Sequence, residues 1–80
     1  MKLVEFKHLS NYVFMLTFEN GDCKATDLKA LLAKYVDENH LTTAQLNKDW
    51  GCLEFNQGAV DIDPKTLYRY AAHHEVTTNR

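Results

Sequence analysis

The sequence has no long hydrophobic run. Among its 80 residues the longest uninterrupted apolar stretch is the five residues Tyr12–Leu16, which contains Val13–Leu16. A membrane-spanning helix needs about 20 consecutive apolar residues, so none is predicted. The N-terminus reaches Glu5 before an apolar secretory core can form, so no signal peptide is expected either. We therefore expect a cytoplasmic protein that does not contact a membrane.

The sequence also lacks an excess of charge of one sign. Nine basic and 11 acidic residues give a formal net charge of −2, and no two lysines or arginines are adjacent. Nucleic acids and anionic membranes are usually bound by a concentrated basic patch, so neither is an expected partner. With 45% apolar residues, the composition predicts one globular domain over residues 1–80. Its core is expected over about 3–74, and residues 75–80 carry no packing signal and are expected to fray.

Cysteine is scarce, and the histidines lack the spacing of a metal site. Cys23 and Cys52 are the only cysteines, and in the cytoplasm they are expected to be reduced and buried. The four histidines form no His-x-x-x-His or similar pair. A zinc site from both cysteines and either His73 or His74 stays open as an alternative. The main prediction is that no metal or cofactor is bound.

Three strands are predicted in the first third of the sequence. Residues 3–8 alternate between apolar and polar, and residues 12–18 are rich in aromatic and β-branched side chains. Asn20–Gly21 lies between two extended runs, which favours a two-residue type I′ turn with positive φ at both positions. In that register Phe18 faces Cys23, and Cys23 lies in the core.

The remaining sequence predicts two strands and further helices. A helix is predicted from Leu28 to about Val36, capped by Asp27, and a short helix from Thr42 or Thr43. Two strands follow, over 52–55 and 59–62. The last element is a helix that begins at Asp63–Pro64 and ends near His73. The pattern does not decide whether residues 47–50 form a strand. The β-β-β-α-β-β-α order predicts an α+β fold, with a small antiparallel sheet and helices packed on one face.

Three residues are candidates for chemistry: Cys52, Asp61 and Asp63. The two aspartates are two positions apart on an extended stretch, so their carboxylates point the same way and can hold a cation or act as acid and base. Cys52 can be an accessible thiol, but no glycine-rich turn beside it offers an oxyanion hole. The simpler interpretation is favoured, in which Asp63 caps the last helix and Asp61 solvates a strand end.

Three apolar residues are candidates for an interaction face: Val13, Met15 and Trp50. Alternation over residues 12–18 places Val13 and Met15 opposite the aromatic side chains, among polar neighbours. Trp50 either covers one edge of the small core, which is the favoured interpretation, or stands exposed at an interface. An apolar centre with a polar rim predicts an unknown protein partner or a weak homodimer.

Three motifs support a family resemblance. They are the hairpin Phe18–Gly21, the helix start Thr26–Leu28 and the block Gly58–Pro64, which reads Gly-Ala-Val-Asp-Ile-Asp-Pro. Over roughly residues 3–70 the sequence resembles the small prokaryotic family catalogued as domain of unknown function 2442. It departs from that family at Phe55, where tryptophan is usual, and at Asn56–Gln57, which replaces a Pro-Asn turn. The resemblance implies a compact α+β domain with no established activity, so no site residue is carried over.

The same resemblance bears on partners. Some relatives carry an additional DNA-binding helix-turn-helix, and others are encoded beside a partner in suspected toxin–antitoxin pairs. No helix-turn-helix segment is visible here, so DNA binding does not transfer. We expect a non-enzymatic protein–protein interaction domain, with an antitoxin-like role as one form of it. The alternative is a small ligand-binding or metal-binding domain, or an enzyme, that uses Asp61, Asp63 or Cys52.

Overall fold

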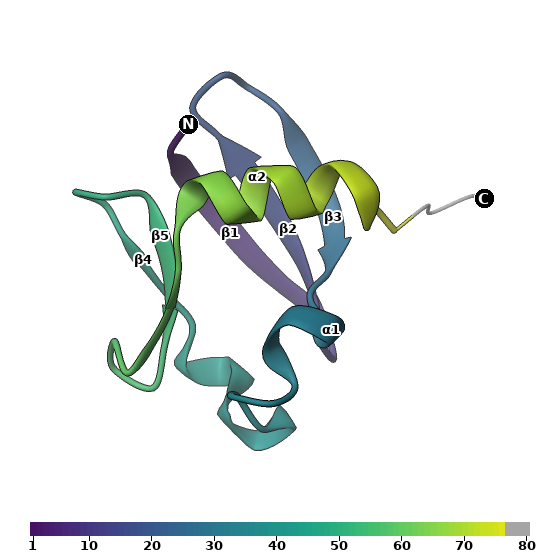
Figure 1. Ribbon diagram of the computed structural model, residues 1–80, viewed down its shortest axis with the longest axis vertical. Coiled ribbons are helices and arrows are strands. Elements are labelled where there is room, and N and C mark those ends of the chain that lie inside the picture. The colour runs from purple at the N-terminus through teal and green to yellow at the C-terminus, as the bar shows by residue number, and fades with distance from the viewer. Residues whose placement is uncertain (77–80) are drawn as a thin grey trace.

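The computed structural model describes residues 1–76 and confirms the α+β class and the element order (Figure 1). The elements are β1 (Leu3–Ser10), β2 (Val13–Phe18), β3 (Cys23–Asp27), α1 (Lys29–Leu32), the 3-10 helix η1 (Glu38–Thr43), β4 (Gln45–Asn47), β5 (Cys52–Phe55), β6 (Val60–Ile62) and α2 (Pro64–His73). The stretch 47–50, which the pattern left open, contains the last residue of β4 and part of a turn.

The strands form two three-stranded antiparallel sheets, β1–β2–β3 and β4–β5–β6. Figure 1 shows α2 crossing one face of the first sheet, with the second sheet beside β1. The sheets are joined where the Leu3 amide donates a hydrogen bond of 3.2 Å to the Gly51 carbonyl. Alternation indicates which face of a strand is buried, but it does not say which strands pair, so the division into two sheets was not predicted.

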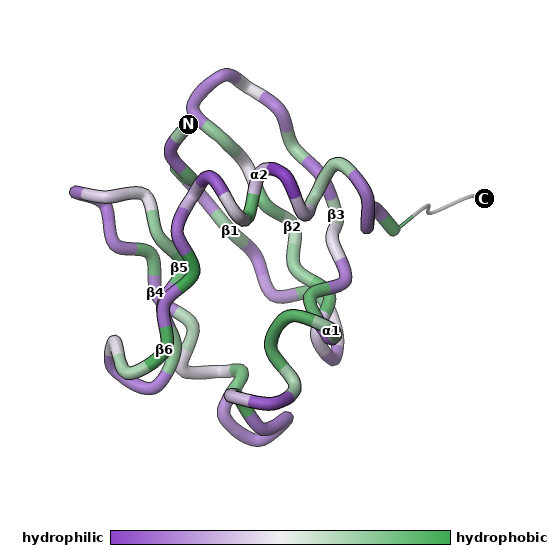
Figure 2. The backbone as a smooth tube through the Cα atoms, viewed as in Figure 1, coloured by the Kyte–Doolittle hydropathy of each residue, from purple (hydrophilic) through white to green (hydrophobic). Residues whose placement is uncertain are grey.

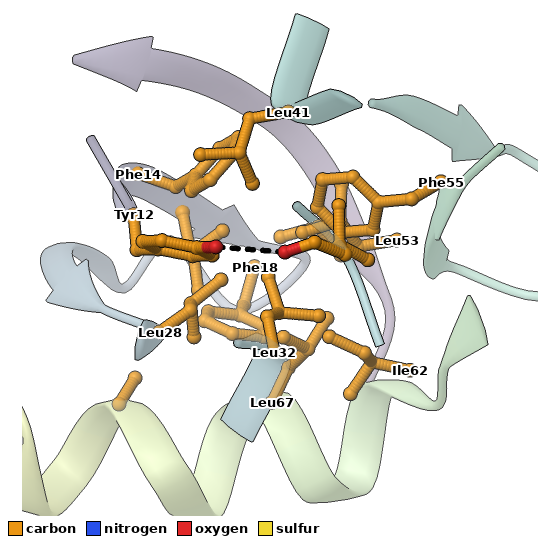
Figure 3. Close-up of a cluster of buried hydrophobic side chains, with 14 residues drawn as sticks. Tyr12, Phe14, Phe18, Leu28, Leu32, Leu41, Leu53, Phe55, Ile62 and Leu67 are labelled. Atoms are coloured by element: carbon orange, nitrogen blue, oxygen red, sulfur yellow. Dashed lines mark hydrogen bonds between the residues drawn. The ribbon is translucent and has the colours of Figure 1, made fainter. Parts of the chain in front are cut away.

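One core lies between α2 and the two sheets (Figure 3). The alternation of β2 is confirmed, because Tyr12, Phe14, Leu16 and Phe18 are all buried. Phe14 meets Phe55 of β5 edge to face, with ring centroids 5.8 Å apart. Hydrophobic stretches in α1, β5 and β6 surround this core (Figure 2). Its main buried polar contact is the hydrogen bond of 2.7 Å from the Tyr12 hydroxyl to the carbonyl of Val36.

The predicted type I′ turn at Asn20–Gly21 is wrong. The Phe18 amide donates to the carbonyl of Asp22, which leaves a three-residue loop in which only Gly21 has positive φ. The register therefore shifts by one residue and pairs Thr17 with Cys23. Because neighbouring strand positions point to opposite faces, Cys23 is exposed instead of buried. The pair of positive φ values expected here occurs at Asn56–Gln57, in the turn between β5 and β6.

The middle of the chain is less helical than predicted. α1 has only four residues, although the Asp27 carboxylate accepts a hydrogen bond of 2.9 Å from the Lys29 amide, as a capping residue would. The following turns bury Val36 and leave Tyr35 at 67% exposed, although both residues fall within the predicted helix. The short helix expected from Thr42 is also wrong, since Leu41 anchors η1 in the core before that point and β4 follows.

The last helix begins as predicted, with Asp63 in an extended conformation before Pro64. Beyond it the chain turns back along β3. The Asp27 amide donates to the carbonyl of His74, and the Val76 amide donates to the carbonyl of Ala25 at 2.7 Å. Residues 75 and 76 therefore have a partner that the sequence did not indicate, because they lie along the free edge of β3. The rest of the expected tail, residues 77–80, lies outside the described residues.

Candidate interaction surfaces

The structure places Val13 and Met15 on the face of the β1–β2–β3 sheet that is opposite α2, as predicted. Met15 lies between Lys7 of β1 and Ala25 of β3 in the same row of the sheet. Both Val13 and Met15 are partly exposed, whereas the residues that alternate with them are buried. This face, which we call the open face, consists of Val4, Glu5, Lys7, Leu9, Val13, Met15, Thr17, Cys23 and Ala25.

Two β-bulges enlarge the apolar part of the open face. The pairing of β1 with β2 skips one residue at Val4 and another at Leu9. A bulge sets two residues against one on the partner strand, so strict alternation is lost at these points. Val4 and Leu9 are 49% and 43% exposed, while Leu3 is buried. Alternation alone places Val4 beside Phe6 toward the core, and nothing in the sequence signals the bulge that turns it outward.

Trp50 lies on a different surface, in the turn between β4 and β5. Its side chain is 71% exposed, so the favoured interpretation, in which it covers the core, is wrong. Gly51 joins this turn to Leu3 at one end of β1, whereas Val13 pairs at the other end of the sheet. Those ends are five residue steps apart along β2, from Val13 to Phe18, which is roughly 17 Å of strand. The predicted interaction residues therefore belong to two surfaces.

The candidates for chemistry gather on the outer face of the β4–β5–β6 sheet. Glu54 pairs with Asp61, and Cys52 occupies the same outward face two positions before Glu54. Burial, reinforced by the charges of Asp61, Glu54 and Asp63, raises the pKa of the Cys52 thiol. A raised pKa keeps the thiol protonated, which opposes nucleophilic chemistry. Within residues 1–76 no group of three or more His, Cys, Asp or Glu side chains is arranged to hold a metal ion.

Asp63 has the surroundings of a capping residue. The Thr66 hydroxyl in the first turn of α2 lowers the pKa of the Asp63 carboxyl, and nearby backbone amides act in the same direction. None of its contacts with those amides reaches the geometry of a side-chain cap hydrogen bond. Asp63 therefore interacts with the start of α2 through the Thr66 hydroxyl and through its charge, because the helix N-terminus carries a partial positive charge.

The two cysteines are expected to differ in reactivity toward a thiol reagent such as dithionitrobenzoate. Cys23 is exposed, whereas Cys52 is partly buried and its raised pKa lowers the thiolate fraction at neutral pH. At pH 7.5 we expect a fast phase that Cys23→Ser removes and a slow phase that Cys52→Ser removes. The slow phase should accelerate in Glu54→Gln, which removes one of the charges that oppose ionisation. A Cys52 that reacts as fast as Cys23 would contradict this electrostatic account.

The comparisons with known proteins identify a family. No curated protein and no solved structure matches the chain. Among the described residues, no helix is both long and apolar enough to span a membrane. One family model, described as Protein of unknown function (DUF2442), matches residues 3–73, which is most of the chain. This chain belongs to the DUF2442 family.

Proposed function

We propose that this chain is a non-enzymatic protein–protein interaction domain that binds its partner through the open face. The observation that carries the proposal is the asymmetry of the β1–β2–β3 sheet. One face is covered by α2 and buried, while the other presents Val4, Leu9 and Met15 to solvent in whole or in part. Glu5 and Lys7 flank this apolar centre. An apolar centre with a charged rim is the usual composition of a protein interface.

The open face favours a weak or transient contact. Three short strands present far less area than the roughly 800 Å² per partner of a standard interface. The partner is either a second copy or an unrelated protein, and no cofactor is required. An antitoxin-like role in a prokaryotic cytoplasm is one form of this proposal, supported by membership of the DUF2442 family. In that form the open face covers a surface of the partner protein.

The enzymatic alternative has less support. It requires ionised Cys52, or Asp61 and Asp63 working as a pair. The surrounding carboxylates oppose ionisation of Cys52. Asp63 interacts with the first turn of α2, which leaves Asp61 as a carboxylate on the surface of a strand. Binding through the open face uses residues that have no other evident role in the fold.

Met15→Lys tests the proposal. The side chain lies on the solvent side of the sheet, so the variant should stay folded, with a change in unfolding free energy within about 0.5 kcal/mol. A lysine at the centre of the apolar patch should abolish association, because its charge would lose water on binding. Light scattering of the purified protein measures self-association. A pull-down from the native cell measures binding of an unrelated partner, and it is then repeated with that partner in purified form.

Tyr35→Lys is the matched control, since it adds the same charge at an exposed aromatic residue outside the open face. It should associate like the unmodified protein. If Met15→Lys unfolds the domain, or if both variants lose association equally, the open face is not the binding surface.

A further inference from the structure

A second surface lies at the junction of the two sheets, around Trp50. A groove of about 230 Å³ opens there between the start of β1 and β4, lined by Lys2, Leu3, Val4, Leu46 and Lys48. Both ionisable residues in this lining are lysines, and the other three are aliphatic. The volume is below the roughly 300–1,000 Å³ of small-molecule pockets, so the groove suits one side chain of a peptide better than a cofactor.

The turn that carries Trp50 is held rigidly beside this groove. The Asn47 side-chain oxygen accepts hydrogen bonds from the amides of Asp49 and Trp50, both at 3.1 Å. The Gly51 amide donates to the Asn47 carbonyl at 2.7 Å. Gly51 packs so closely on Lys2 that a Cβ atom there would lie 2.5 Å from the Lys2 Cβ. A large aromatic side chain displayed on a preorganised turn is typical of the residues that dominate binding energy at interfaces.

The two lysines of the groove are free to meet an incoming charge. Within residues 1–76 there is one ion pair, between the Met1 amino group and the Glu19 carboxylate at 3.8 Å. The same carboxylate accepts a hydrogen bond from the Lys2 backbone amide, so it is occupied by main-chain groups. Among the described residues, no carboxylate lies within ion-pair distance of either lysine ammonium. Asp49 is the acidic neighbour in the turn, and its side chain is exposed to solvent.

We infer that this junction groove, whose charged lining is Lys2 and Lys48 and whose adjoining turn carries Trp50, docks an acidic segment of a partner protein that carries a large apolar side chain. The apolar side chain enters the groove against Leu3 and Leu46, carboxylates pair with the lysines, and the indole covers the segment. Two isolated lysines on a chain of net charge −2 would bind nucleic acid poorly, and an aliphatic floor does not suit a phosphate. The inference rests on the proposed interaction role. The groove shares Val4 with the open face, but Lys2, Leu46 and Lys48 lie outside that face.

Trp50 supplies the readout, since it is the single tryptophan in the chain. Three synthetic hexapeptides serve as probes: Glu-Glu-Leu-Phe-Glu-Glu, its analogue with lysine in place of glutamate, and its analogue with Gly-Gly in place of Leu-Phe. The acidic apolar peptide should change the Trp50 emission saturably, and this effect should weaken as salt is added. The other two peptides should have little effect. Equal binding of the basic peptide, or no change with the acidic peptide at millimolar concentration, would overturn the inference.

Charge reversal identifies the residues responsible. The Lys2→Glu/Lys48→Glu double variant should weaken binding of the acidic peptide by about tenfold or more, given the usual worth of two exposed charge pairs. Lys34→Glu/Lys65→Glu changes the net charge equally at exposed lysines elsewhere and should bind almost normally. Lys2→Gln/Lys48→Gln provides the same test without placing a new carboxylate beside Glu19, should the reversal variant fold poorly. If the control pair weakens binding as much, the effect is one of net charge and the groove is not the site.

The two proposals can fail separately. Met15→Lys should leave peptide binding at Trp50 intact. If Met15→Lys loses association and no peptide binds the groove, the open face stands and the junction groove fails. If the peptide binds as expected and Met15→Lys has no effect on association, the groove stands and the open face fails.

Discussion

Phe55→Ala is expected to remove most of the stability of the protein at 25 °C. Phe55 is fully buried, and its ring packs edge to face on Phe14, so it ties the β4–β5–β6 sheet to the β1–β2–β3 sheet. Truncating a buried phenylalanine costs about 3–5 kcal/mol, because apolar contacts are lost and a cavity is left. A domain of this size rarely has more than about 5 kcal/mol of stability. Urea unfolding followed by far-ultraviolet circular dichroism measures the loss.

Phe55→Leu is the control for this substitution. Leucine keeps most of the apolar volume, so the loss should be about 1.5 kcal/mol or less and the fold should survive. If Phe55→Ala instead leaves a cooperative transition at the original urea midpoint, the two sheets do not share one core. Two separate transitions in the unmodified protein would lead to the same conclusion.

Gly51→Ala is expected to have the second largest effect, a loss of about 2–5 kcal/mol. Gly51 has a φ of +74°, a conformation that costs a residue with a Cβ atom roughly 1–2 kcal/mol. The new methyl group would also lie 2.5 Å from the Lys2 Cβ and 2.8 Å from the Lys2 Cα. One of these is backbone, so the turn or the start of β1 must move, which adds an overpacking cost of about 1–3 kcal/mol. Thermal unfolding measures the total.

Gly21→Ala separates the two causes. Gly21 also has positive φ, at +94°, but no atom lies within 4 Å of the position of an added Cβ. Its loss should be about 1–2 kcal/mol, which is the conformational cost alone. Equal losses at Gly21 and Gly51 would show that the contact with Lys2 relaxes freely, and the rigid display of Trp50 would then lose its support.

Several elements of the fold follow from local sequence alone. The alternation of apolar residues in β2 predicted its buried face, because a strand must turn successive side chains to opposite sides. Asp63 and Pro64 predicted the first residue of α2. The strands predicted over 52–55 and 59–62 are present as β5 and β6, and they pair Leu53 with Ile62 and Phe55 with Val60. In each case the deciding interactions lie within about ten residues, so a short window of sequence contains them.

The candidate surfaces required the tertiary structure. Asn20 donates hydrogen bonds to Asp22 and to the hydroxyl of Tyr68, and Tyr68 also donates to Asp22. The two contacts that involve Tyr68 come from α2, far along the chain, and they hold the three-residue loop that sends Cys23 to the open face. A turn motif carries no information about a helix more than 40 residues away.

The two interaction surfaces follow the same division. Alternation was enough to place Met15 on the solvent side of the sheet, because that depends only on its neighbours in β2. Val4 joined it through a bulge that the pairing with β2 decided. Trp50 became exposed, and the junction groove formed beside it, where Gly51 meets Lys2. Local sequence determines which way a strand residue points, whereas packing between distant segments decides which of those residues end up side by side on the surface.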